Sequence, residues 1–204
     1  MLRNDGTLWV NIGDTYAGGG FGAANYPEQA IGSKQATNAG SMGAVGRSGQ
    51  TYGMKPKDLI GIPWMLAFAL RSDGWYLRQD IIWHKPNPMP ESVTDRCTKS
   101  HEYIFLLSKS RKYYYDAEAI KEPVAYSGGS DHRNKRSVWS VPTQPYSDAH
   151  FAVFPTNLIS PCILAGCPVG GTVLDPFAGS GTTLSESQRL GRHSIGIEAN
   201  PQYI

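Results

Sequence analysis

A glycine-rich loop between an apolar strand and a helix is the feature that most constrains the fold. Residues 172–174 read as a short buried strand, and the loop Asp-Pro-Phe-Ala-Gly-Ser-Gly follows at residues 175–181. Residues 182–190 have a helical pattern that ends at a glycine, and residues 194–198 form a second apolar strand that ends on a glutamate. Strand–helix–strand alternation of this kind predicts a parallel, doubly wound α/β sheet.

The loop is suited to a bound cofactor. Its glycines tolerate positive φ and let the backbone approach a ligand closely. The N-terminus of the helix that follows offers free N–H groups and a partial positive charge, which suit a carboxylate or a phosphate. Glu198, at the end of the next strand, is placed to hydrogen-bond a ribose hydroxyl.

There are four hypotheses for this loop: three different ligands, or no ligand at all. A phosphate-binding P-loop requires Gly-Lys-Ser/Thr, and the loop holds no lysine. A nicotinamide dinucleotide favours a third glycine where Leu184 stands. S-adenosylmethionine carries no phosphate, and an acidic strand end such as Asp175 tolerates its sulfonium and amine better than a pyrophosphate. The remaining alternative is a glycine-rich turn without a ligand.

The middle of the chain predicts a mixed sheet. Apolar residues at helical spacing predict a helix over residues 59–70 with an irregular first turn, because prolines stand at 56 and 63. Residues 76–84 and 103–107 read as strands with no helix between them, so we expect an antiparallel pair joined by a long loop. Residues 159–165 predict a further helix.

The first residues predict a strand that needs neighbours. Residues 7–12 are aromatic and apolar, and a central parallel strand would have partners on both sides. Residues 2–6 fit the tail of a helix that turns into this strand. Since the body of such a helix is absent, we expect the chain to be truncated.

Composition adds little about function. The formal net charge is only +2, although Lys and Arg gather in the middle third. The three cysteines form no Cys-x-x-Cys, which predicts reduced thiols and no metal site. No apolar run approaches the ~20 residues of a membrane span, so we expect a cytoplasmic protein that is not bound to a membrane.

Several blocks together resemble the DNA N4-cytosine and N6-adenine methyltransferases. The quoted loop, extended to Thr183, and Gly-Ile-Glu-Ala-Asn-Pro at residues 196–201 resemble the cofactor motifs of that family. Four further stretches are similar to its other blocks, namely residues 5–14, 80–91, 98–107 and 150–155. The cofactor motifs lie near the C-terminus, which resembles the permuted subclass whose catalytic block comes first.

The resemblance implies a reaction and a gap. It implies methyl transfer from S-adenosylmethionine to the exocyclic amine of cytosine (N4) or adenine (N6) in double-stranded DNA, with the target base flipped out. The family's catalytic Ser/Asp/Asn-Pro-Pro-Tyr is not among these residues, so no catalytic residue is assigned. We expect a fragment, completed by a separate chain that carries the missing N-terminal segment. The resemblance also implies a prokaryotic or phage-encoded protein associated with the nucleoid. A catalytically dead cofactor- or DNA-binding remnant and a nicotinamide-dependent oxidoreductase are the alternatives.

The expected organisation is one partial methyltransferase domain over residues 1–204. Its fold is a doubly wound, Rossmann-like sheet with an antiparallel strand pair, incomplete at both ends. Residues 17–56 read as a flexible glycine-rich insertion, and residues 110–149 as an irregular region resembling a target-recognition region. Residues 150–204 form the cofactor-binding β-α-β part.

Site residues follow from these assignments. Asn11 and Asp14 end a strand at the ligand-binding edge of the sheet, so we expect them near the target base or cofactor. Trp83 and Trp139 are interpreted as core residues. The resemblance implies cofactor contacts at His150, Ala152, Phe154, Pro155, Asp175, Phe177, Gly179, Ser180, Gly181, Thr182 and Glu198. The predicted phosphate contacts are Lys85, Arg96, Lys99, Arg133, Lys135 and Arg136.

Overall fold

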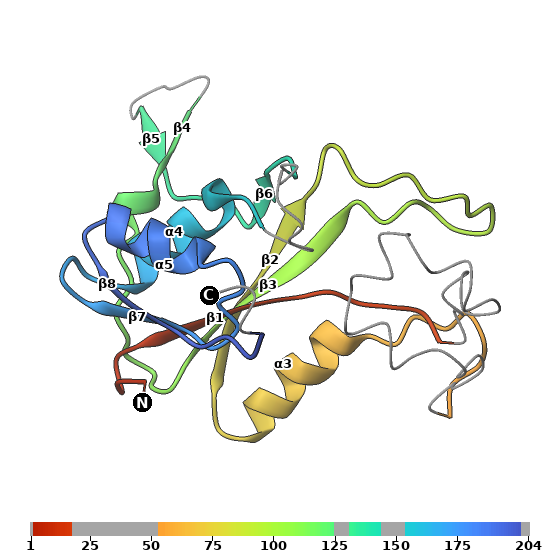
Figure 1. Cartoon of the computed structure of the whole chain (residues 1–204), viewed down its shortest axis with the longest axis horizontal. Helices are drawn as coiled ribbons and strands as arrows, with labels where there is room; N and C mark the ends of the chain where they lie inside the picture. The colour runs from red at the N-terminus through yellow and green to blue at the C-terminus, as the bar shows by residue number, and fades with distance from the viewer. Residues whose placement is uncertain (1, 18–52, 125–130, 144–153, 201–204) are drawn as a thin grey trace. The chain divides into compact units, whose positions relative to one another are not determined.

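The computed structural model describes residues 2–17, 53–124, 131–143 and 154–200 (Figure 1). The chain divides into two compact units. One consists of Met1–Ile12 with Ala67–Ile204, and the other is Gly13–Leu66. Each unit is described by itself.

A four-stranded mixed sheet forms the centre of the first unit. Its strands are β1 (Thr7–Ile12), β2 (Tyr76–His84), β3 (His101–Ser108) and β6 (Val138–Ser140), in the order β1-β3-β2-β6. β3 runs antiparallel to both β1 and β2, whereas β6 runs parallel to β2. The expected antiparallel pair is therefore confirmed, and β1 and β2 have the predicted bounds.

β1 differs from the expectation of a strand with neighbours on both sides. Within the described residues it pairs with β3 alone and forms an edge of the sheet. The residues before it form a turn in place of a helix tail. Gly6 N donates to Arg3 O at 3.1 Å and closes this turn, and the exposed Arg3 guanidinium pairs with Asp5 at 2.8 Å.

The core lies where this sheet meets α4 (Thr156–Gly166). Its buried members are Ile81, Trp83, Ile104, Trp139 and Leu158. The indole N–H of Trp83 donates to Val141 O at 2.8 Å, and that of Trp139 donates to Arg136 O at 2.7 Å. Both tryptophans are thus satisfied core residues, as predicted. β3 carries the most deeply buried run, because it lies between two strands.

The predicted strand–helix–strand unit is present after α4. β7 (Thr172–Asp175) and β8 (His193–Gly196) form a parallel pair, and α5 (Thr182–Arg189) connects them. α5 is fixed to α4 through Glu186, which is buried and binds the Arg189 guanidinium at 2.6 Å and the Ser160 hydroxyl. Together with the mixed sheet, this unit confirms the α/β fold class.

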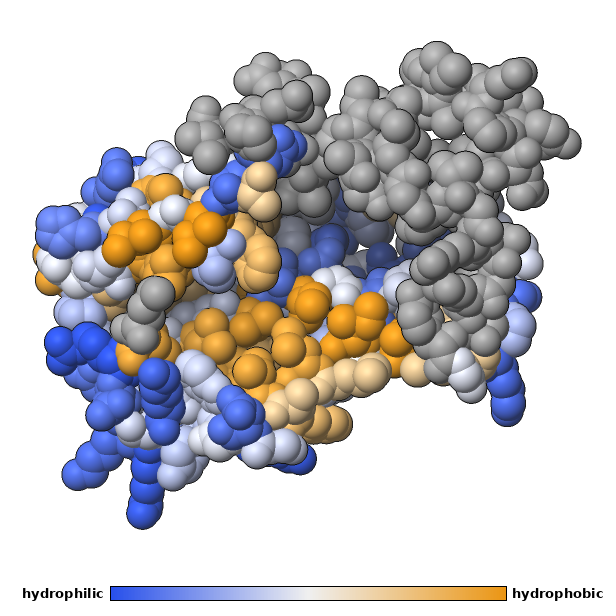
Figure 2. All heavy atoms as spheres, turned by 60° about the horizontal axis from the view of Figure 1, so that its bottom comes forward, coloured by the Kyte–Doolittle hydropathy of each residue, from blue (hydrophilic) through white to orange (hydrophobic). Residues whose placement is uncertain are grey.

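In the second unit, Asp14 determines where a helix begins. Its carboxylate accepts N–H groups from Gly61 at 2.9 Å and Ile62 at 3.1 Å, which are free amides at the start of α3 (Ile62–Ser72). Residues before Ile62 are not helical, in agreement with the predicted irregular first turn. α3 runs across the boundary between the units and leaves apolar side chains exposed, among them Met65 and Phe68. Figure 2 colours the residues by hydropathy and shows hydrophobic side chains at the surface.

Residues 110–149, which were predicted to be irregular, contain only short elements among their described residues. They are the 3-10 helix η1 (Glu118–Ile120) and the two-stranded ribbon of β4 (Glu122–Pro123) and β5 (His132–Arg133), followed by β6. Among the helices that the structure describes, none has the length and apolar character needed to cross a membrane.

Candidate cofactor site and nucleic-acid interface

The glycine-rich loop leaves β7 and is bound to the chain that follows β8. Asp175 Oδ1 accepts the N–H of Phe177 at 3.0 Å, which turns the chain sharply at the end of the strand. Ala178 N donates to Ile197 O, and Ile197 N donates to Asp175 O, each at 2.9 Å. The loop conformation is therefore fixed from both sides by backbone hydrogen bonds, with the Phe177 side chain 87% exposed.

Two glycines in the loop have left-handed backbone conformations. Gly179 has φ +52° and Gly181 has φ +79°, and a Cβ at either position would meet no atom within 4 Å. The constraint is therefore conformational, and the space above both glycines is open. Gly181 is the N-cap of α5, and no side chain caps this helix. Its first N–H groups, next to Ser180 and Thr182, are placed to receive an anionic group such as a carboxylate.

Glu198 holds this loop in place. Its Oε2 accepts the N–H of Gly179 at 2.7 Å, and its Oε1 accepts the N–H of Asn200 at 2.8 Å. These backbone donors, Asn200 first and then Gly179, hold the pKa of Glu198 below its ordinary value of 4.5. Sequence reasoning gave Glu198 only a ribose hydroxyl as partner and missed this role. Each carboxylate oxygen retains a second lone pair for such a hydroxyl.

Gly196, at the end of β8, lets Leu184 of α5 and Ala178 of the same loop pack closely against the strand. A Cβ there would lie 2.7 Å from Leu184 Cδ2 and 3.0 Å from Ala178 Cβ. The absence of a side chain thus lets α5 and the loop lie directly on β8. In cofactor-binding β-α-β units a glycine commonly serves this purpose, because it lets the helix pack closely on the strand.

Other predicted cofactor contacts lie at the start of α4. Pro155 is buried and is the N-cap of α4, and Phe154 packs against the core cluster. His150 and Ala152 lie outside the described residues. Of the predicted set, the structure brings Asp175, Phe177, Gly179, Ser180, Gly181, Thr182 and Glu198 into one cluster at the carboxyl end of β7.

Asn11 belongs to a polar cluster at the carboxyl ends of β1 and β2. Its Nδ2 donates to Glu102 Oε2 at 3.1 Å and to Tyr103 O at 3.0 Å. Glu102 also pairs with the Lys85 ammonium, which lies 4.3 Å from the centre of the Trp83 ring. Both amide hydrogens of Asn11 are thus used, so its Oδ1 is held in a defined direction. The structure assigns Asp14, by contrast, to the start of α3.

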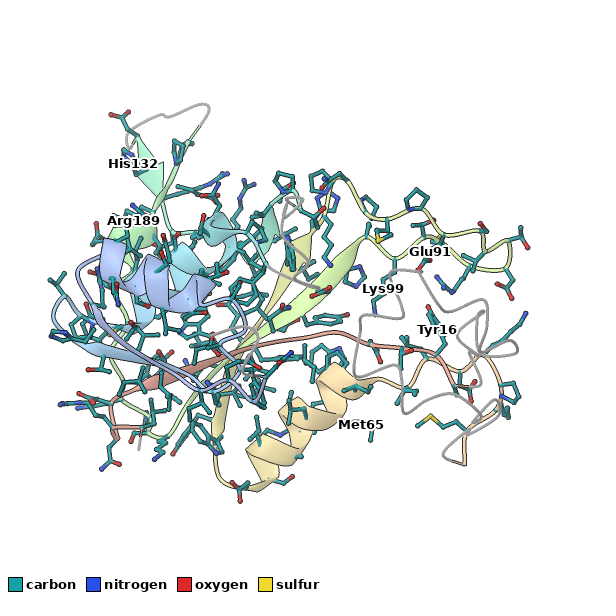
Figure 3. The ribbon with its side chains drawn as sticks, viewed as in Figure 1. Tyr16, Met65, Glu91, Lys99, His132 and Arg189 are labelled. Carbon is teal, nitrogen blue, oxygen red and sulfur yellow. The ribbon has the colours of Figure 1, made fainter. Side chains whose placement is uncertain are left out.

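The predicted phosphate contacts on the loop between β2 and β3 are held by glutamates. Arg96 pairs with Glu91 at 2.6 Å, and Glu91 also accepts the backbone N–H of Lys99 at 3.4 Å. Figure 3 shows Glu91 and Lys99 on this loop. In the Arg96–Glu91 and Lys85–Glu102 pairs, predicted phosphate contacts are thus bound to carboxylates of the protein itself.

The same holds at the β4–β5 ribbon. Glu122 accepts hydrogen bonds from Arg133 at 2.8 Å and from Arg136 at 2.6 Å. Desolvation opposes ionisation of Glu122, but the two arginines prevail and lower its pKa. Lys135 lies 5.1 Å from the centre of the Trp139 ring. Sequence reasoning identified the cations and missed this glutamate, although its opposite charge 11 and 14 residues away was a visible signal.

No grouping of three or more His, Cys, Asp or Glu side chains able to hold a metal ion occurs in the described part of the chain. The three cysteines are free thiols. Burial raises the pKa of Cys162 to about 12, so this thiol is not an activated nucleophile.

The glycine loop on a β-α-β unit, together with a mixed sheet, defines an α/β protein with a candidate cofactor site at the carboxyl end of β7. The chain belongs to the N6_N4_Mtase family of DNA methylases, whose model matches residues 1–204. This membership confirms the resemblance.

Individual relatives agree with the family assignment. The chain is 55% identical over 202 residues to the type II methyltransferase M.SmaI of Serratia marcescens, covering 99% of this chain and 66% of that relative. It thus spans about two thirds of the length of this relative. A solved structure of the M1.HpyAVI–SAM complex is 26% identical, with a TM-score of 0.52, over 70% of this chain and 66% of that one. The cytosine-N4-specific PvuII DNA methyltransferase shares the fold at 18% identity, with a TM-score of 0.67, over 99% of this chain and 62% of that one.

Proposed function

We propose that this chain provides the S-adenosylmethionine site and part of the DNA-binding surface of a site-specific DNA methyltransferase. The reaction is methyl transfer to the exocyclic amine of cytosine (N4) or adenine (N6) in duplex DNA. The observation that carries the proposal is the loop of residues 175–181, fixed by Glu198 in front of an uncapped helix N-terminus. Family membership and the SAM complex of the M1.HpyAVI relative support it.

The residues present fit this cofactor. The α5 N-terminus and the Ser180 and Thr182 hydroxyls would hold its carboxylate, and the remaining lone pairs of Glu198 would accept ribose hydroxyls. The open space above Gly179 and Gly181 admits it without a clash. When bound, S-adenosylmethionine supplies an electrophilic methyl group. Asp175 places a carboxylate near the positive charges of the cofactor.

Asn11 is the residue of this chain that we propose for contact with the target base. Its amide nitrogen is occupied by Glu102 and by the carbonyl of Tyr103, so its Oδ1 faces away as an acceptor. An exocyclic amine is a donor, and its reaction requires that its N–H groups be held. Lys85 neutralises Glu102 and so keeps that carboxylate from repelling nearby DNA phosphates.

We further propose that a polar-Pro-Pro-Tyr segment outside these 204 residues completes the catalytic site. That tetrapeptide does not occur in the sequence of these 204 residues. The alternative, a remnant that binds cofactor or DNA without chemistry, rests on the same observation. The two differ in whether adding the segment restores methyl transfer.

Calorimetric titration with S-adenosylmethionine tests the cofactor site directly. We expect saturable binding that Glu198→Ala weakens at least tenfold, whereas Glu118→Ala, an exposed glutamate on η1, serves as the matched control and leaves it unchanged. Absence of binding by the folded wild-type chain would contradict the proposal. Transfer of a tritiated methyl group to DNA, with and without the missing segment, then separates enzyme from remnant.

A further inference from the structure

The loop between β2 and β3 presents one large apolar side chain to solvent. Residues 85–100 are all described by the structure and form neither helix nor strand, and the loop extends beyond the ends of both strands (Figure 1). Met89 lies in its first half and is 85% exposed. Single exposed apolar residues are common on protein surfaces, so exposure alone assigns no role to Met89. Its role follows from how the loop holds it.

Prolines restrict the backbone on both sides of Met89. They stand at positions 86, 88 and 90. A proline has a nearly fixed φ and favours an extended conformation in the residue before it, which here applies to Asn87 and Met89. A proline-rich segment of this kind is semi-rigid, so it loses little conformational entropy on binding. Met89 is therefore carried by a preorganised segment.

Hydrogen bonds fix this segment to the chain that follows β6. Asn87 Nδ2 donates to Thr143 O at 3.0 Å, and Thr143 N donates to Asn87 Oδ1 at 2.9 Å. Thr143 Oγ1 also donates to Asn87 O at 3.4 Å. At the base of the loop, Lys85 N donates to Ser100 O at 2.7 Å. The backbone is thus anchored two residues before Met89, and the fold determines where this side chain is presented.

The returning half of the loop brings cations to the half that carries Met89. Glu91, two residues after Met89, binds the Arg96 guanidinium at 2.6 Å and accepts Lys99 N at 3.4 Å. An apolar side chain beside cations matches a partner that has both anionic groups and apolar faces. Duplex DNA is such a partner, because its phosphates lie next to stacked bases.

The base of the loop adjoins the residue that we propose for contact with the target base. Lys85 pairs with Glu102, and Glu102 Oε2 accepts a hydrogen bond from Asn11 Nδ2 at 3.1 Å. Met89 follows Lys85 by four residues, which a chain spans in at most about 14 Å. This reach is comparable to the width of the DNA major groove, about 12 Å. Asn11 and Met89 can therefore belong to one contact with DNA.

We propose that Met89 is a wedge that enters the base stack of duplex DNA beside the target base. Methionine is unbranched and polarisable, so it adapts to the aromatic faces of neighbouring bases. Apolar side chains, methionine among them, are inserted between base steps by other DNA-binding proteins. A wedge that interrupts stacking lowers the cost of moving the target base out of the duplex. This inference rests on the proposed action on duplex DNA and adds a contact made by stacking in place of charge.

Binding to a weakened duplex tests the wedge. A labelled duplex of mixed sequence is compared, by fluorescence anisotropy at low salt, with a copy that carries one mismatched pair. Less stacking has to be disrupted at the mismatch, so we expect the chain to bind the mismatched copy about tenfold more tightly. Met89→Ala should remove this preference, whereas Met89→Leu should retain it. Met65→Ala, at another exposed methionine, is the matched control and should keep the preference.

A fluorescent base reports the stacking itself. Aminopurine placed beside the mismatch gains emission when it is unstacked, so the wild type and Met89→Leu should raise its emission and Met89→Ala should not. The Tm of each variant controls for folding. Equal affinity of the wild type for the two duplexes would overturn the wedge, as would a preference that survives in Met89→Ala.

The same titrations separate this inference from the proposed function. Binding of both duplexes without a preference overturns the wedge alone and leaves the proposed DNA-binding surface in place. Absence of binding to either duplex overturns the wedge together with that surface. Calorimetric titration with S-adenosylmethionine, which needs no DNA, reports on the cofactor site independently of both.

Discussion

Replacing Gly181 by alanine isolates the conformational contribution of the cofactor loop. Gly181 has φ +79° and ψ +19°, and a Cβ there would meet no neighbouring atom, so steric overlap with the rest of the protein plays no part. For a residue with a Cβ, the left-handed region costs about 1–2 kcal/mol. Alanine also lowers the conformational entropy of the unfolded chain. That effect stabilises a protein by up to about 1 kcal/mol where alanine can adopt the native backbone conformation without strain, and the left-handed conformation of Gly181 does not meet this condition.

The cost should appear in two measurements. In a chain of 204 residues, 1 kcal/mol corresponds to about 2–4 °C, so the Tm of Gly181→Ala should fall by about 2–8 °C. If the loop relaxes in place of the whole fold unfolding, the same free energy weakens S-adenosylmethionine binding by about 5- to 30-fold. Circular dichroism during thermal unfolding measures the change in Tm, and calorimetric titration measures the change in S-adenosylmethionine affinity.

Gly181→Asn is the matched control. Asparagine adds a larger side chain but tolerates the left-handed conformation, so it should recover most of the lost stability and affinity. If asparagine were as harmful as alanine, occupation of the open space above the loop would be the cause, and the conformational explanation would be refuted. Unchanged Tm and affinity in Gly181→Ala would refute it as well.

Three further perturbations have defined outcomes. Gly166→Ala, at the last residue of α4, forces a methyl group against the Trp9 indole at a typical overpacking cost of about 1–3 kcal/mol, so the Tm should fall; a rise would show that the indole moves freely. Because the pKa of Glu198 is depressed, its stabilising contribution is present above pH 4.5 and is lost as the pH falls through the folded-state value; the Tm difference between the wild type and Glu198→Gln should shrink below pH 4.5, and a constant difference would exclude this linkage. Iodoacetamide at pH 8 should label exposed Cys97 much faster than half-buried Cys162, whose pKa is raised, as intact-mass spectrometry would show; equally rapid labelling of both would contradict the raised pKa of Cys162.

Local elements were predictable because their signals are local. The bounds of β1 and β2 follow from runs of apolar and aromatic residues, and the loop before α5 follows from glycine spacing at a strand–helix boundary. The irregular first turn before α3 was predictable from its prolines, but its cap was not: Asp14, 47 and 48 positions upstream, accepts the N–H groups of Gly61 and Ile62. Periodicity within the helix carries no information about such a cap.

Pairing partners across the chain were not predictable in the same way. β1 carries the apolar pattern of an interior strand, yet it lies at the edge of its sheet in the described residues, and the sequence of a strand does not specify how many neighbours it has. Similarly, Glu198 was assigned to a ligand because its position after β8 matches a ribose contact. The contact that the structure shows is with Gly179, which the fold brings next to it from the preceding loop.

The glutamates change how the basic residues of this chain should be interpreted. Arg133 and Arg136 share the carboxylate of Glu122, so a DNA phosphate can bind them only by displacing Glu122 or by joining it in a shared network. Displacement would leave a carboxylate beside a phosphate, which is unfavourable, unless the ribbon also moves. A shared network requires no rearrangement of the ion pairs, because each guanidinium has several N–H donors and Glu122 Oε1 accepts only one from each arginine. The ion pairs would then orient the remaining donors toward DNA, and removing Glu122 would loosen the arrangement as well as add positive charge.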